Sequence, residues 1–263
     1  MTKSSFIAMQ ELSFNILPSQ PAYPQGNDLL EKLAQHEDQN ETGAALLKNK
    51  SFQGFMHFLA YHSPYLSELL VRHWPFVVRF CYEDAASLIE EIMAGVTVWP
   101  ATEETRHHLR IAKQRIALLT ALSDITERLP LLSITAILSD FAERSVRAAL
   151  QGLLDDAFQK KQLSHADQET SGIFILGMGK LGGRELNYSS DIDLIVLYDA
   201  DRLPFTGGMS KQHFMTRLTQ ELVGIMQDRT ADGYVFRTDL RLRPDPASTP
   251  PAVTMQAATR YYE

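Results

Sequence analysis

The sequence predicts an α+β protein, with a helical amino-terminal region followed by a region of short strands and helices. Apolar residues recur at three- and four-residue steps as far as about residue 160, which is the helical period. From about residue 172 the pattern changes to short β-branched runs separated by glycine and proline. The polar segment LSHADQETSG lies between the two patterns. We therefore predict a helical region over residues 1–165 and a second domain over residues 171–263.

Helix start signals recur through the first region. Asparagine, serine, aspartate and threonine commonly cap helix amino termini, and proline is favoured in the first turn. Such residues precede most of the apolar-periodic segments, and a second proline limits one of the two long helices. The predicted starts are Asn27, Ser51, Ser63 before Pro64, Asp84, Thr102 and Ser133, with ends at Gly95, Pro130 and near Phe158.

The second region alternates strand and helix signals. Residues 172–176 and 191–198 are short apolar runs that indicate strands, and residues 210–228 form an amphipathic helix. A third strand is predicted over residues 233–243, followed by a proline-rich loop over 244–253 and the start of a helix at MQAATRYYE. We expect the chain to be a fragment whose second domain is truncated at its carboxy-terminal end.

Composition excludes several classes of protein. The 263 residues are 44% hydrophobic, which excludes a disordered or fibrous chain. The net charge is 25 − 32 = −7, so bulk charge does not favour nucleic acid or an anionic membrane as a partner. Cys81 is the only cysteine, and no apolar run approaches the ~20 residues of a membrane span. A soluble cytoplasmic protein without a nucleic-acid or membrane partner is expected.

A glycine-rich segment follows the first strand and admits two interpretations. Gly177, Gly179 and Gly182 satisfy G-x-G-x-x-G, and Asp199 stands where a dinucleotide site has its ribose-binding acid. However, only residues 183–190 separate the last glycine from the next strand. A crossover between parallel strands needs roughly 10–12 residues or more, so a dinucleotide-binding fold is disfavoured. The sequence also lacks a P-loop at this place.

The second interpretation uses the acids. In a strand, Asp191 and Asp193 project from the same face because side chains alternate. Neighbouring carboxylates repel, and Mg²⁺ prefers such oxygen ligands. An isolated D-x-D is more often a solvated strand end. Asp239 favours the metal site over a solvated strand end, because alternation in the predicted third strand places it on one face with arginines. A site for metal-bound phosphates needs carboxylates for the metal and arginines for the phosphate oxygens. The residues of that face are Val235, Arg237, Asp239, Arg241 and Arg243.

The combined spacing is more specific than its parts. Gly182 and Gly183 are followed by the D-x-D beginning nine residues after Gly182, and a later strand carries Asp239. This spacing resembles the arrangement of polymerase-β-type nucleotidyltransferases, and the resemblance implies a mixed sheet with flanking helices. More narrowly, GMGKLGGRELNYSSDIDLI and FRTDLRLRP resemble the glutamine synthetase adenylyltransferase/adenylyl-removing enzymes, over about residues 172–262. Members of that family are far longer and contain two nucleotidyltransferase halves.

The resemblance implies an activity and its residues. ELNYSSDID is like the amino-terminal copy of the family motif, which is associated with phosphate-dependent removal of AMP from a glutamine synthetase tyrosine, giving ADP. It implies glutamine synthetase as partner, a PII-type nitrogen-signal protein in the full-length family, Mg²⁺ at a two-metal site, and ADP or ATP with inorganic phosphate. Asp191, Asp193 and Asp239 would be the catalytic metal ligands, Gly182, Gly183 and Ser190 would line the nucleotide phosphates, and Lys180, Arg241 and Arg243 match motif positions without an assigned role.

Two other functions stay open at this point. The chain is alternatively a catalytically incomplete nucleotidyltransferase-like module that binds glutamine synthetase or a nitrogen-signalling protein. A nucleotidyltransferase acting on a nucleic acid or a small molecule is a weaker option, since the sequence has no basic excess.

Overall fold

A computed structural model describes residues 23–97 and 102–263, so the first 22 residues of the predicted helical region lie outside the described part. The chain divides into two compact units. One comprises residues within 1–92 and 114–134, and the other comprises residues 93–113 and 135–263. The domain boundary predicted near residues 165–171 lies between the last long helix and the first strand. The second unit also includes helical residues that come before this boundary, so the predicted division into domains stays a prediction.

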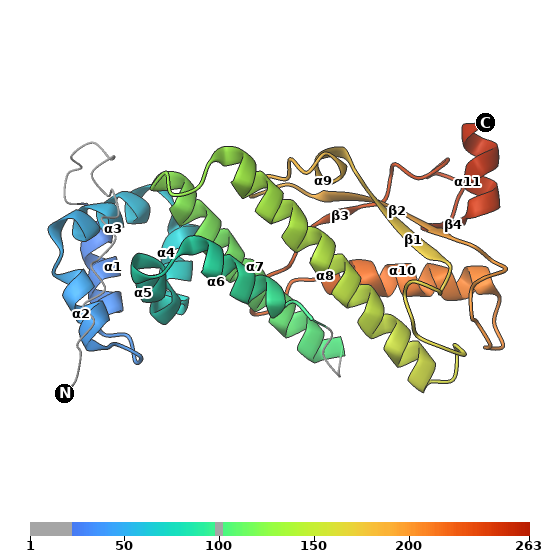
Figure 1. The fold of residues 1–263 in the computed structure, drawn as a ribbon, viewed down its shortest axis with the longest axis horizontal. Coiled ribbons are helices and arrows are strands. Elements are labelled where there is room, and N and C mark those ends of the chain that lie inside the picture. The colour runs from blue at the N-terminus through green and yellow to red at the C-terminus, as the bar shows by residue number, and fades with distance from the viewer. Residues whose placement is uncertain (1–22, 98–101) are drawn as a thin grey trace. The chain divides into compact units, whose positions relative to one another are not determined.

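Short helices build the first unit. Asn40, Asn49 and Ser63 each accept a hydrogen bond from a first-turn amide, which satisfies donors that a helix start leaves free. Trp74 is fully buried and its indole N–H donates to Oε1 of Gln39 at 3.0 Å. The helices are α1 Pro24–Ala34, α2 Glu41–Leu47, α3 Lys50–His62, α4 Pro64–Arg72, α5 Trp74–Tyr82 and α6 Ala85–Ala94 (Figure 1).

Several predicted helix starts need correction. The first helix begins at Pro24 rather than after Asn27, and Asn49 rather than Ser51 caps the third. The prediction at Ser63 and Pro64 is confirmed, and Asp84 Oδ2 accepts from the amide of Ser87 as an opening residue does. Helix α2 was not predicted, because its seven residues are too few to show a period.

The sheet belongs to the second unit and confirms the predicted α+β class. Strands β1 Ile173–Met178 and β2 Ile192–Tyr198 are antiparallel, while β3 Thr238–Asp239 and β4 Ala252–Thr254 both pair in parallel with β2. The antiparallel β1–β2 pair agrees with the rejection of a dinucleotide-binding crossover. Helices α7 Thr102–Ile125 and α8 Leu131–Gln159 are each divided between the units, after residues 113 and 134. The other helices of this unit are α9 Gly179–Gly182, α10 Lys211–Gln227 and α11 Met255–Tyr262 (Figure 1).

Strand β2 is the centre of this unit. Ile192 and all residues from Leu194 to Tyr198 are buried, which explains their continuous apolar run. Ile195 and Leu197 pack with Val253 of β4 and Ala258 of α11. Asp193 is the polar exception and lies at the end of the strand where β3 pairs.

The predicted strand over residues 233–243 is wrong in extent. Only Thr238 and Asp239 pair with β2. Val235 and Phe236 are both buried instead of alternating, because both amides donate to the carbonyl of Met226 at the end of α10. The predicted loop over 244–253 also needs correction, since its last two residues enter β4. The structure's described helices include none that is both long and apolar enough to cross a membrane.

Candidate functional site

The predicted acids meet at one end of the central strand. Asp193 on β2 and Asp239 on β3 are direct partners in the parallel register, and Asp191 comes just before β2. Burial raises the pKa of Asp193, and the neighbouring carboxylates of Asp191 and Asp239 raise it further. The fold therefore holds three carboxylates close enough to interact, as the sequence predicted.

Asp239 has a counter-ion of its own. The Arg241 guanidinium donates from Nε and Nη2 to the Asp239 carboxylate, with the shortest distance 2.5 Å. These bonds hold the pKa of Asp239 below its ordinary value and raise that of Arg241. The Asp239 side chain is 14% exposed and that of Arg241 is 84% exposed, so the carboxylate is fixed in the protein while the arginine lies at the surface.

The carboxylate cluster fits a divalent cation in its chemistry. Carboxylate oxygens that repel one another, as those of Asp191 and Asp239 repel Asp193, are donors that Mg²⁺ stabilises. Within residues 23–97 and 102–263, no group of three or more His, Cys, Asp or Glu side chains lies in a position to hold a metal ion as the structure stands. Asp239 is instead engaged by Arg241.

A glycine turn places β1 and α9 against the acids. Gly179 has a left-handed φ of +52°, and a Cβ on it would lie 2.6 Å from Oδ2 of Asp193. A Cβ on Gly182 would lie 2.5 Å from the carbonyl oxygen of Gly177. The amide of Gly183 donates to the carbonyl of Gly179 at 3.0 Å and is thus used within the turn. Gly179 was missed as a site residue, although the middle glycine of G-x-G-x-x-G was a visible signal.

A side-chain network fixes the entry to β2. Oδ1 of Asn187 accepts from the amide of Ser189 at 3.3 Å and from Oγ of Ser190 at 2.7 Å. Arg237 donates to the carbonyl of Ser189 at 2.6 Å. The predicted residue Ser190 is therefore next to Asp191 with its hydroxyl turned to Asn187. Asn187 and Arg237 were not predicted as site residues, because sequence spacing does not show this network.

The predicted cations differ in their surroundings. Arg243 donates to the carbonyls of Leu240, Pro246 and Thr249, so its guanidinium holds the loop between β3 and β4 together. Lys180 is exposed on α9, beside Gly179. Arg241 is the predicted arginine that contacts an acid of the cluster.

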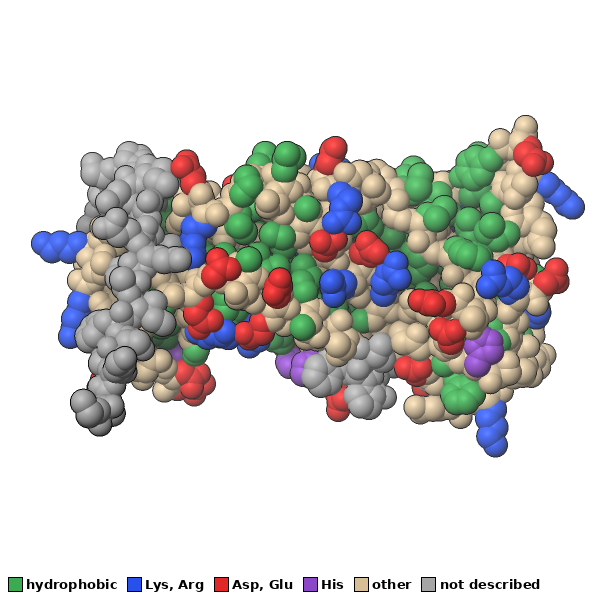
Figure 2. Space-filling model, viewed as in Figure 1, with side chains coloured by type: hydrophobic (Ala, Val, Ile, Leu, Met, Phe, Trp, Pro, Cys, Tyr) green, Lys and Arg blue, Asp and Glu red, His purple; other side chains and the backbone are tan. Residues whose placement is uncertain are grey.

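A groove of about 850 Å³ runs between α8 and β1 and reaches the glycine turn at Gly177, Met178 and Gly182. Phe174 and Leu176 of β1 are 37% and 45% exposed, and Figure 2 shows hydrophobic side chains gathered over the strands between α8 and α11. The groove is large enough for a nucleotide-sized ligand.

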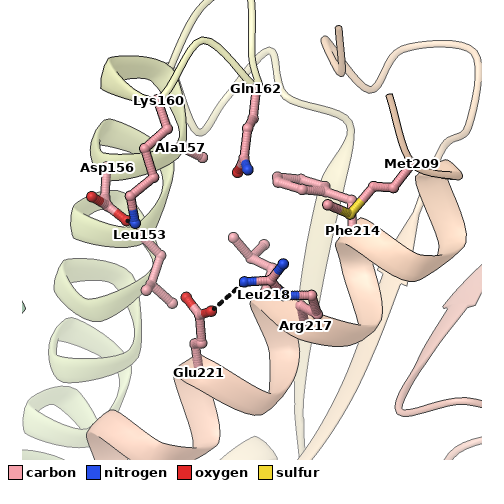
Figure 3. A pocket seen from close by; sticks show the side chains of 10 residues that line it. All are labelled: Leu153, Asp156, Ala157, Lys160, Gln162, Met209, Phe214, Arg217, Leu218 and Glu221. Carbon is pink, nitrogen blue, oxygen red and sulfur yellow. Dashed lines mark hydrogen bonds and ion pairs between the residues drawn. The ribbon is translucent and has the colours of Figure 1, made fainter. Parts of the chain in front are cut away.

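A much smaller hollow, of about 50 Å³, lies between α8 and α10 (Figure 3). Its cations are already paired, Lys160 with Asp156 at 2.5 Å and Arg217 with Glu221 at 3.7 Å. This hollow has room for little more than water, and we assign it no function.

Comparison with known proteins adds the family context. The family model described as "Glutamate-ammonia ligase adenylyltransferase" matches residues 52–263. A protein of Bradyrhizobium diazoefficiens is 44% identical over 228 residues, covering 83% of this chain and 23% of the relative. Relatives from Xanthobacter autotrophicus (40% over 212 residues; 78% and 21% covered) and Rhizobium meliloti (43% over 206; 77% and 21%) are similar. All three are named "Bifunctional glutamine synthetase adenylyltransferase/adenylyl-removing enzyme", and the chain spans about a fifth of their length.

Proposed function

This chain belongs to the glutamate-ammonia ligase adenylyltransferase family, and on that basis we propose that its acid cluster transfers an adenylyl group on glutamine synthetase. The proposed direction is removal of AMP from an adenylylated tyrosine with inorganic phosphate, giving ADP. The observation that carries the proposal is the meeting of Asp191, Asp193 and Asp239 at the paired ends of β2 and β3.

The reaction is a displacement at the α-phosphorus of the tyrosine-bound AMP. A phosphate oxygen forms a new bond to that phosphorus, the bond to the tyrosine oxygen breaks, and the released phenolate takes up a proton. Mg²⁺ held by Asp191, Asp193 and Asp239 would neutralise charge on the phosphate oxygens and favour attack and departure.

The remaining residues orient and neutralise. Arg241 is exposed beside the acids, with a planar fork suited to phosphate oxygens. Gly179 leaves the Asp193 carboxylate its room, and Asn187 holds the segment that leads into Asp191. In this proposal Gly182, Gly183 and Lys180 shape the turn beside the nucleotide, and Arg243 acts through the loop that follows Asp239.

The direction of the reaction and its setting extend the proposal. The motif ELNYSSDID resembles the copy associated with AMP removal, and this favours removal over ATP-dependent addition. We place the reaction in the cytoplasm, under control of a PII-type nitrogen-signal protein in the full-length family.

The test is magnesium-dependent release of ADP from adenylylated glutamine synthetase by the purified chain. We expect release to require phosphate and to fall at least about 100-fold in Asp191→Asn, since a lost metal ligand removes several kcal/mol of transition-state stabilisation. Asp199→Asn is the matched control. Asp199 directly follows β2, at the opposite end of the strand from Asp193, and its carboxylate accepts from the amide of Asp201.

The outcomes separate the proposed function from its alternative. Equal release by wild type and Asp191→Asn would contradict the metal-ligand assignment. A chain that binds glutamine synthetase tightly but releases no nucleotide under any condition would support the alternative of a catalytically incomplete binding module.

A further inference from the structure

We propose that Arg241 is a built-in competitor of the metal ion: it holds the Asp239 carboxylate while the site is metal-free and must release it before Asp239 can serve as a ligand. The proposal rests on the proposed function, because it takes the three acids to be metal ligands. It gives Arg241 a role in setting how readily the site loads, in addition to any contact with phosphate.

The contact uses both oxygens of the carboxylate. Oδ1 of Asp239 accepts from the backbone amide of Arg241 at 2.8 Å and from Nε at 3.0 Å. Oδ2 accepts from Nε at 2.8 Å and from Nη2 at 2.5 Å. A divalent cation needs lone pairs of these same oxygens, so the guanidinium fork and the cation compete for them.

The two partners differ in how firmly they are held. Asp239 is 14% exposed and is fixed by backbone pairing with β2, where it lies opposite Asp193. The Arg241 side chain is 84% exposed, so it can rotate into water without loss of core packing. One fixed carboxylate thus has two alternative cationic partners, and only the arginine has to move.

Local geometry makes the exchange independent of domain movement. Arg241 is two residues after Asp239, and the backbone amide bond to Oδ1 keeps the carboxylate oriented when the side chain leaves. The nearby Arg243 cannot replace it, because its guanidinium is bonded to three loop carbonyls. The competition is therefore specific to one arginine.

Mn²⁺ binding to the whole chain tests the proposal without reference to activity. Free Mn²⁺ is measured by electron paramagnetic resonance for wild type, Arg241→Gln, Arg241→Lys and Arg260→Gln. Loss of an exposed, charge-assisted fork predicts binding about threefold to tenfold tighter in Arg241→Gln. Arg241→Lys keeps the charge but not the fork and should fall between Arg241→Gln and wild type.

Arg260→Gln makes the same change in net charge on α11 and should shift the dissociation constant less than twofold. Arg241→Gln binding Mn²⁺ no tighter than wild type, or an equal gain in Arg260→Gln, would overturn the competition while leaving the metal site intact. Failure of both Asp191→Asn and Asp193→Asn to weaken Mn²⁺ binding would instead overturn the metal assignment, and this proposal with it.

A second measurement follows the arginine itself. In ¹⁵N-labelled chain the Arg241 Nε–H resonance, identified by its absence from Arg241→Gln, should shift on titration with Mg²⁺ and exchange faster with water. A resonance unchanged at saturating Mg²⁺ would show that Arg241 stays on Asp239 and would overturn the proposal.

Discussion

Replacing Gly179 with alanine is expected to disable the acid cluster while the chain still folds. The left-handed φ of +52° costs an alanine about 1–2 kcal/mol. The new Cβ would also lie 2.6 Å from Oδ2 of Asp193, whereas ordinary van der Waals contact begins at 3.4 Å. The carboxylate must therefore move by 3.4 − 2.6 = 0.8 Å, which a side-chain end can do at low cost to stability.

We expect the displaced Asp193 carboxylate to lower the rate of the reaction. A misplacement of about 1 Å at a reacting site lowers activity by about 100-fold. We predict that Gly179→Ala loses about 100-fold in kcat/KM for ADP release and about 1–2 kcal/mol in the free energy of unfolding by urea.

Gly233→Ala is the matched control. Gly233 also has a left-handed φ, of +82°, but a Cβ there meets nothing within 4 Å. It should lose a similar 1–2 kcal/mol of stability and keep its activity within about threefold of wild type. If Gly179→Ala were as active as Gly233→Ala, the claim that Gly179 leaves room for a catalytically placed Asp193 carboxylate would be refuted.

Three further predictions concern stability. The raised pKa of Asp193 means that its ionisation opposes folding above its ordinary pKa. Metal-free Asp193→Asn should therefore be more stable than wild type at pH 7.5, and the gain should disappear in urea titrations as the pH falls below both pKa values. Burial lowers the pKa of Lys113 to about 8, so wild-type stability should rise between pH 8 and the ordinary 10.5, whereas the melting temperature of Lys113→Met should not show that rise. Arg243→Ala should lose about 1–3 kcal/mol by urea unfolding, because three loop carbonyls lose their donor, and unchanged stability would refute this role.

The sequence correctly predicts the elements in which a helical period continues over many residues or in which a run of residues is uniformly apolar. Helix α10 shows an amphipathic period with a serine cap, and β2 is a continuous apolar run, so both were located within two residues. The third strand failed because Val235 and Phe236 bury together against the end of α10, a tertiary contact that overrides alternation. Strand β4 was missed because it is three residues long and follows two prolines.

The site divides in the same way. The D-x-D spacing and its likeness to the nucleotidyltransferase arrangement grouped Asp191, Asp193 and Asp239, and the fold brings them to one end of β2. Sequence spacing could not assign different roles to Arg241 and Arg243, because both stand at alternate positions after Asp239. Only the fold shows that one binds the acid and the other binds loop carbonyls. The position of Gly179 also depends on a close approach across the β1–β2 pair that spacing does not reveal.

The most direct test of the proposed chemistry uses adenylylated glutamine synthetase, the purified chain, Mg²⁺ and ³²P-labelled phosphate. Adenylyl transfer to phosphate predicts label in the β-phosphate of ADP, with the same reaction lost in Asp193→Asn. Release of unlabelled AMP in place of labelled ADP, or equal labelling by wild type and Asp193→Asn, would contradict it.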